Sequence, residues 1–207
     1  MTGIISDNVA RTSGLIKAAA GGGAWTLIKS ISASSSATVS FVNGSSDVVL
    51  DSTYPIYYFK FINIHPATDG AKFQFNLSVD GGSNYNVTKT TSFFHAFHDE
   101  ADSSTLLGYR SAADLAQSTS DQVLFWEVDN DADSTASGYL HLFEPSSTTF
   151  VKNFIAQSIG VANSATAGNQ YIAGYGNTTS AVNAVQFQMS SGNIDAGTIK
   201  LYGIKDS

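Results

Sequence analysis

Apolar and polar side chains alternate along much of this chain, and no other feature of the sequence restricts its fold as strongly. The clearest case is Ala71–Val79, where every second side chain is apolar and the others are polar. Its apolar set is Phe73, Phe75, Leu77 and Val79, and its polar set is Lys72, Gln74, Asn76 and Ser78. Trp25–Ile31 and Ala37–Val42 alternate in the same way. Because successive side chains of a β-strand point to opposite faces, this period of two predicts strands with one face inward.

Further strands are predicted along the rest of the chain. Ile56–Ile64 is a near-continuous run of aromatic and β-branched residues, which is typical of a strand buried on both faces, and Pro66 ends it. Asp80–Ser83 predicts a tight turn in which glycine supplies positive φ. One helical turn is expected at Ser111–Gln117, with Ser111 as its N-cap. The remaining predicted strands are Gln122–Val128, Gly138–Glu144, Phe150–Ile159, Asn169–Tyr175, Val185–Met189 and Thr198–Ile204.

Together these strands predict an all-β fold for residues 25–207. Turn signals separate them every ten to twenty residues, which favours an antiparallel, jelly-roll-like β-sandwich. An immunoglobulin-type sandwich is the alternative. The sequence has no internal repeat of the kind that builds propellers or solenoids.

Residues 1–24 differ from everything after them. They are rich in Gly and Ala, lack sustained alternation, and end in the run Ala18–Gly23 (AAAGGG), which predicts a hinge. They nevertheless carry an apolar set: Ile4, Ile5, Val9, Leu15 and Ile16. We therefore expect an extended N-terminal arm whose apolar side chains contact a neighbouring protein. A disordered terminus is the alternative.

Composition excludes several classes of function. The chain has no cysteine, which removes disulfide scaffolds, thiolate metal sites and cysteine nucleophiles. Its net charge of −7 argues against a nucleic-acid duplex as partner, because phosphate binding needs clustered Lys and Arg. No run of 18 apolar residues and no signal-peptide pattern occurs. We expect a soluble protein that is made and folded in a cytoplasm and binds no membrane.

Two clusters contain metal-ligand residue types. His95–Glu100 (HAFHDE) combines two histidines with two carboxylates, but on a strand His95 and His98 would point to opposite faces. A polar loop is favoured there. In the second cluster, Asp129, Asp131 and Asp133 stand at positions one, three and five, as in calcium loops.

The calcium pattern then fails. Ser134 stands where the sharp turn needs glycine, and Leu140 stands where a bidentate Glu belongs. The triad Asp129, Asp131 and Asp133 is therefore a weak calcium candidate, and a solvated hairpin loop is favoured. We expect no cofactor.

Catalytic patterns are equally scarce. The sequence has no GxSxG elbow and no phosphate-binding GxxxxGK[ST] loop. Its three glutamates, Glu100, Glu127 and Glu144, are a thin supply for the paired carboxylates of a glycosidase. His65, before Pro66, is expected to be hydrogen-bonded in a turn, and His141 is expected to be partly buried. The chain is predicted not to be an enzyme.

Exposed aromatic rings would give a sugar-binding platform, although core packing explains them equally well. Exposure decides between the two, and the sequence does not show it. The candidates are Tyr54, Tyr57, Tyr58, Tyr85, Tyr109, Trp126 and Tyr175.

Several stretches resemble structural proteins of tailed-bacteriophage virions, in particular small jelly-roll proteins of marine and cyanobacterial phages. The resemblance lies in residues 4–30, 33–41, 51–86 and 196–204, including the run DSTYPIYYFKFINIHPATDGAKFQFNLSVDGGSNYN. It does not extend to residues 90–195, and it includes no catalytic motif.

The resemblance implies a protein assembled in the host cytoplasm and located in the virion. It implies a capsid decoration (cement) protein that bridges subunits of the major capsid protein through its arm and body, as a homotrimer. A tail-fibre or tail-tip component that binds host glycans is the alternative that the resemblance leaves open.

Overall fold

The computed structural model describes residues 25–163 and 165–205. The five apolar side chains of the predicted arm lie outside these ranges. The described chain forms twelve strands and no helix, and therefore no helix able to span a membrane. The strands are β1 (Trp25–Ser36), β2 (Thr38–Val42), β3 (Ile56–Pro66), β4 (Ala71–Ser78), β5 (Lys89–Asp99), β6 (Thr105–Tyr109), β7 (Gln122–Val128), β8 (Ala136–Phe143), β9 (Lys152–Ala162), β10 (Thr166–Gly176), β11 (Ala184–Met189) and β12 (Ile194–Ile204).

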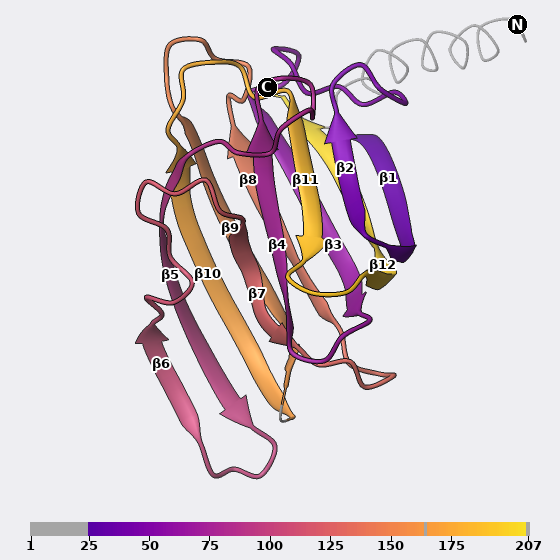
Figure 1. Ribbon diagram of the computed structural model, residues 1–207, viewed down its shortest axis with the longest axis vertical. Coiled ribbons are helices and arrows are strands. Elements are labelled where there is room, and N and C mark those ends of the chain that lie inside the picture. Colours follow the sequence, from indigo (N-terminus) through magenta and orange to yellow (C-terminus); the bar gives the residue numbers. More distant parts are fainter. Residues whose placement is uncertain (1–24, 164, 206–207) are drawn as a thin grey trace, which may run out of the picture.

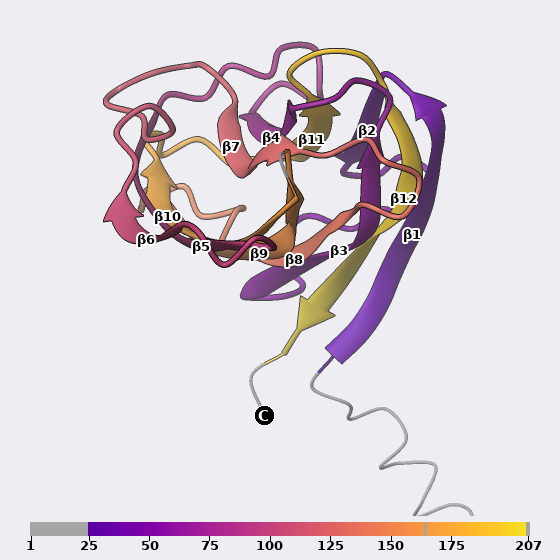
Figure 2. The ribbon, with the colours of Figure 1, turned by 90° about the horizontal axis from the view of Figure 1, so that it is seen from below.

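Two curved layers of antiparallel strands face each other (Figures 1 and 2). The larger layer has the strand order β1-β12-β3-β8-β9-β10-β5-β6, and the smaller layer has the order β7-β4-β11-β2. A single bridge, between Val128 of β7 and Ala162 of β9, joins the layers along one side. The chain passes from β1 directly into β2 on the other side, so the antiparallel sheet is nearly closed. This confirms the all-β, antiparallel prediction.

The core lies between the layers and is mostly aromatic. Phe187 of β11 is fully buried, and its ring lies 5.3 Å from that of Phe59 and 5.3 Å from that of Phe61, both on β3 of the opposite layer. It also contacts rings of its own layer, Phe73 and Phe75. Phe187 is therefore a hub that connects the two layers.

The predicted faces of β4 are only partly correct. Phe73, Phe75 and Leu77 are buried as expected, but Val79 follows the end of the strand and is partly exposed. Asn76 was predicted to face outward but is buried. The loop before β7 covers it, and the Asn76 amide donates hydrogen bonds to that loop, at Thr119 O and Asp121 Oδ1. Ser78 is buried as well, and its hydroxyl bonds Asp80. In the turn that follows, Gly81 and Gly82 have the predicted positive φ.

Two predictions for the middle of the chain are wrong. The cluster predicted as a polar loop, His95–Glu100, lies mostly within β5, where Phe93 and His95 point inward and Phe94 points outward. Ser111–Gln117 contains no helical turn; Ala113 N–H bonds the carbonyl of Arg110 in a simple turn. Strand β6 was not predicted at all.

Lys89 is fully buried at the start of β5. Its ammonium donates hydrogen bonds to Asn76 Oδ1 and to the carbonyl of Val87. Burial lowers the pKa of Lys89 to about 8, against a smaller opposing effect of the Asp121 carboxylate. The folded protein therefore releases this proton at a lower pH than the unfolded chain does.

Stability is expected to rise by on the order of 2 kcal/mol between about pH 7.5 and about pH 9.5. In this window the unfolded chain keeps the proton of Lys89, so raising the pH favours the folded state. Above about pH 10 the stability is expected to fall again. Burial raises the pKa of Tyr57 to about 12, so in this range the tyrosine ionises in the unfolded chain but not in the folded protein, which favours unfolding. Urea unfolding at a series of pH values measures this, and Lys89→Met should flatten the rise. A rise of equal size in that variant would contradict the assignment to Lys89.

Candidate functional site

The weak calcium candidate lies in the loop that connects β7 to β8. The carboxylate of Asp129 is used within this loop, where it accepts hydrogen bonds from Asp131 N–H (3.2 Å) and the Ser134 hydroxyl (3.1 Å). Among the described residues, no group of three or more His, Asp or Glu side chains is placed to hold a metal ion. The loop is not a hairpin, as the sequence suggested, because β7 and β8 belong to different layers.

The histidines are spread over the molecule. His95 is buried and His98 is exposed beside Asp102 (3.0 Å), so the two lie on opposite faces of β5. His65 Nδ1 lies 2.9 Å from the carbonyl oxygen of Pro66, the hydrogen bond expected at that strand end. His141 is half-buried among aromatic rings, and burial lowers its pKa, which keeps the imidazole neutral at pH 7.

The three glutamates lie in two places. The main chains of Glu100 and Glu127 bond the turn between β9 and β10, at Ala165 and Asn163 respectively. The N–H of Glu144 bonds Pro55, which precedes β3. The structure therefore does not bring all three glutamates together.

Trp126 lies under two cations. Lys72 Nζ is 3.7 Å and the Arg110 guanidinium 4.1 Å from its ring. A hollow of about 240 Å³ beside this ring is lined also by His95 and Gln170. Since cations occupy the ring, Trp126 is not an open sugar platform.

The other candidate aromatics divide between core and surface. Tyr57 is fully buried, and its hydroxyl bonds the main chain of Asp51. Tyr58 and Tyr109 lie on the outer face of the larger layer, the face turned away from the core. Tyr139, Tyr171 and Phe94 share that face and were not among the candidates. The sequence does not show which face of a strand is exposed, so these three residues could not be found from it.

Strand register gathers these residues into one row that crosses the larger layer. Each member pairs directly with the next on the neighbouring strand, from β1 to β6. We call this set the central row: Ser30, Lys200, Lys60, Tyr139, Gln157, Tyr171, Phe94 and Tyr109.

Two parallel rows flank the central row, two residues away along each strand except on β1, where a bulge places Leu27 three residues from Ser30. One contains Leu27, Tyr202, Tyr58, His141, Ile155, Ala173 and Ser92, and the other contains Ser137, Ile159, Asn169, Ala96 and Leu107. The three rows together are the aromatic face. They contain no Asp or Glu, although the chain has 17 acidic residues.

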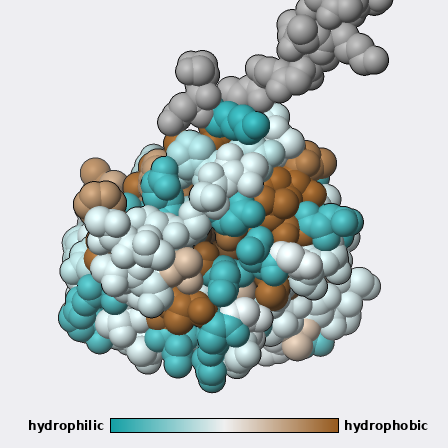
Figure 3. All heavy atoms as spheres, turned by 90° about the horizontal axis from the view of Figure 1, so that it is seen from above, coloured by the Kyte–Doolittle hydropathy of each residue, from teal (hydrophilic) through white to brown (hydrophobic). Residues whose placement is uncertain are grey.

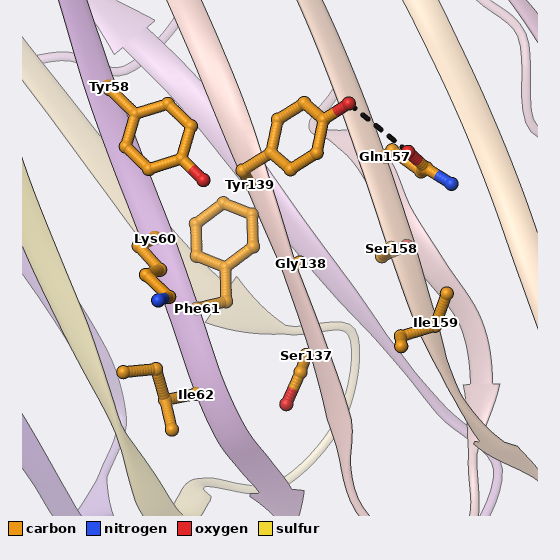
Figure 4. Close-up of a pocket in the computed structure, with 10 residues that line it drawn as sticks. All are labelled: Tyr58, Lys60, Phe61, Ile62, Ser137, Gly138, Tyr139, Gln157, Ser158 and Ile159. Carbon is orange, nitrogen blue, oxygen red and sulfur yellow. Dashed lines mark hydrogen bonds between the residues drawn. The ribbon is translucent and has the colours of Figure 1, made fainter.

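Two near-parallel pairs of rings lie on this face. Tyr58 and Tyr139 have ring centroids 5.6 Å apart and planes 24° apart, and Figure 4 shows them on neighbouring strands. Trp25 and His141 also contact the Tyr58 ring edge-on, with centroids 4.6 and 4.7 Å away. Phe94 and Tyr171 are 4.8 Å and 7° apart. Burial raises the pKa of Tyr58, with a further contribution from Tyr139 and Tyr202, so its hydroxyl is neutral at physiological pH.

A ladder of hydrogen bonds connects the two ring pairs. The Tyr139 hydroxyl donates to Gln157 Oε1 (3.1 Å; Figure 4), and Gln157 Nε2 donates to Asn169 Oδ1 (3.1 Å). Asn169 Nδ2 in turn donates to the Tyr171 hydroxyl (3.1 Å). The ladder fixes the orientation of both amides. Each amide NH₂ still has a second N–H to offer.

Two shallow hollows open on the aromatic face. One of about 410 Å³ lies among Tyr58, Lys60, Ser137, Tyr139 and Ile159 (Figure 4). The other, of about 240 Å³, is lined by Phe94, Ile155, Tyr171 and Ala173. Both are bordered by Tyr139 and Gln157, so they adjoin along the central row. The arrangement offers ring faces, amide donors and two lysines.

Comparison with known proteins adds no relative, because no protein-family model, curated protein or solved structure matches this chain.

Proposed function

We propose that this chain is a structural protein of a tailed-bacteriophage virion, and specifically a capsid decoration protein with a jelly-roll-like sandwich body. The stretches that resemble such proteins support this reading, and the two-layered antiparallel body is compatible with it. The observation that carries the proposal is the aromatic face, which is broad, apolar and free of carboxylates in a protein of net charge −7.

Such a face needs a partner. Its exposed large apolar side chains are Leu27, Phe94, Leu107, Tyr109, Ile155 and Ile159, and Leu107 is 76% exposed. The three rows hold 20 residues; at roughly 4.8 Å between strands and 6.6 Å between side chains on one face of a strand, they cover on the order of 600 Å². That area is somewhat smaller than the ~800 Å² that each partner contributes to a stable interface of standard size. Exposed apolar side chains that cluster on one face, with polar groups around them, mark interaction sites on soluble proteins.

The end of the molecule seen from above has a different character. There, hydrophobic residues surface in patches between hydrophilic ones (Figure 3). This mixture of hydrophobic and hydrophilic residues is ordinary for the surface of a soluble protein.

The major capsid protein is the proposed partner, and the arm and the body are proposed to bridge its subunits. Because the capsid lattice repeats these contacts many times, they would supply avidity. Closed head-to-tail contacts between copies would produce the proposed homotrimer.

Stoichiometry in purified particles tests this proposal. Mass spectrometry normalised to the major capsid protein should give a ratio near one, or a simple fraction such as one third. A few to a few tens of copies would instead place the chain in the tail and favour the second candidate below. Absence from particles would overturn both.

Removal of residues 1–24 tests the arm. The shortened chain is expected to keep its cooperative unfolding transition, because the described core lies wholly within residues 25–205, but to lose attachment to particles. Co-sedimentation with decoration-free capsids measures attachment, with the full chain as control. Full attachment by the shortened chain would remove the arm from the mechanism.

A second candidate function is a tail-fibre or tail-tip component that binds host glycans. The paired ring faces and the amide ladder of the aromatic face favour it, since sugars bind to flat aromatic rings through their C–H faces and to amides through their hydroxyls.

A further inference from the structure

We propose that the aromatic face binds one oligosaccharide chain bearing a carboxylated sugar, laid along the central row. Its sugar rings lie on the ring pairs Tyr58–Tyr139 and Tyr171–Phe94, and its carboxylate lies at Lys60 and Lys200. This inference rests on the glycan-binding candidate function and assigns the ligand class, the direction of the chain and its polarity.

The direction follows from the register. Tyr139 and Tyr171 occupy the same row on β8 and β10, with Gln157 of β9 between them. At roughly 4.8 Å between strands, the two rings stand about 10 Å apart across the sheet. An extended sugar chain presents apolar C–H faces and hydroxyls in alternation. Along the row the Gln157 amide stands between the rings of Tyr139 and Tyr171, so ring, hydrogen-bonding group and ring follow one another in the order in which such a chain would meet them.

The ladder supplies the polar half of the site. Gln157 Nε2 and Asn169 Nδ2 each use one N–H within the ladder and keep one for a ligand. The hydroxyl of Tyr171 accepts from Asn169 and retains its own proton to donate. Because these groups are already oriented, binding a sugar hydroxyl costs little ordering of side chains.

Charge identifies the acidic sugar and its position. Lys60 and Lys200 are direct partners on β3 and β12, so two like charges stand side by side on one face. Such a pair is unfavourable unless an anion lies near it. Within the described residues the one ion pair is His98–Asp102, so no carboxylate of this part of the chain pairs with either lysine. A ligand carboxylate would.

The far end of the central row has the opposite character. There, the Tyr109 hydroxyl donates to the Asp114 carboxylate at 2.6 Å. An anion is therefore favoured at the β3–β12 end and disfavoured at the β6 end, which gives the bound chain a polarity.

The test measures binding of the full-length chain to an array of oligosaccharides of four to eight sugars. The carboxylated members are oligomers of mannuronate, galacturonate and sialic acid. The neutral members are cello- and malto-oligomers. Binding to carboxylated members is expected, and it should weaken as salt rises from about 50 to about 300 mM. Tyr139→Ala and Tyr171→Ala should each weaken the best ligand by about tenfold or more. Tyr139→Phe keeps the ring but removes the hydroxyl that begins the ladder, so its loss should be smaller than that of Tyr139→Ala.

Lysine variants test the polarity. Lys60→Gln combined with Lys200→Gln should reduce affinity for carboxylated ligands by about tenfold and flatten the salt dependence. Phe150→Ala is the control for the two Tyr→Ala variants, since Phe150 is 70% exposed but lies outside the aromatic face. Urea unfolding of each variant separates lost binding from lost folding.

Three results would overturn this inference. Equal binding of neutral and carboxylated members would remove the carboxylate assignment while leaving glycan binding intact. No binding to any member would remove the glycan function, while particle stoichiometry would still test the virion role separately. Self-association of the chain in light scattering that Tyr171→Glu abolishes would make the face a contact between copies.

Discussion

Replacing Phe187 by alanine is expected to lower the free energy of unfolding by about 3–5 kcal/mol. The ring is fully buried and contacts aromatic rings of both layers, including Phe41, Phe59 and Phe61. Truncation removes these contacts and leaves a cavity that strands fixed by their hydrogen bonds cannot close. Urea denaturation followed by fluorescence measures the loss. A loss of this size is a large share of the stability of a typical domain.

Two further variants show whether this loss of stability comes from the contacts that Phe187 makes with both layers. Phe150→Ala removes the same atoms from an exposed site and should change stability by less than about 0.5 kcal/mol. Phe187→Leu refills most of the volume and should fall between the two. A loss below about 1 kcal/mol for Phe187→Ala would contradict the hub role of this ring.

Replacing Gly138 by valine is expected to cost about 3 kcal/mol or to prevent folding. A Cβ at this position of β8 would overlap the carbonyl oxygen of Gln157 and lie 2.7 Å from Ser158 Cα. Both atoms belong to the main chain of β9, so only separation of the two strands would relieve the overlap. The same shift would disturb the register on which the central row depends.

Gly108 of β6 is the matched control. There an added Cβ would meet only the Leu106 side chain, at 3.7 Å, which is ordinary contact. Gly108→Ala should therefore unfold within about 0.5 kcal/mol of the unaltered chain. Thermal and urea unfolding of both variants measure the difference, and a Gly138 variant as stable as the Gly108 variant would show that β8 and β9 separate easily.

Much of the fold could be predicted because alternation is a local property. The alternation of Ala71–Val79 and of Ala37–Val42 is visible in neighbouring residues alone, and β4 and β2 lie there. The prediction failed at β5, where two histidines and two carboxylates close together in the sequence favoured a polar loop. In the structure His95 is buried between the layers and His98 faces outward. Strand β6 is short, contains Gly108, and exposes both Leu106 and Leu107, so it shows no alternation to detect.

The sequence by itself determined that this chain is all-β, that its strands are antiparallel, and roughly where ten of the twelve described strands lie. Only the tertiary structure decided which strands are neighbours, and therefore that Tyr58, Tyr139, Gln157, Tyr171 and Phe94 share one surface. Side-chain alternation depends on adjacent residues, whereas strand pairing joins segments as far apart as Trp25 of β1 and Ile204 of β12. A shift of one residue in any pairing would turn that strand's side chains to the other face, and no local pattern records which register the core selects.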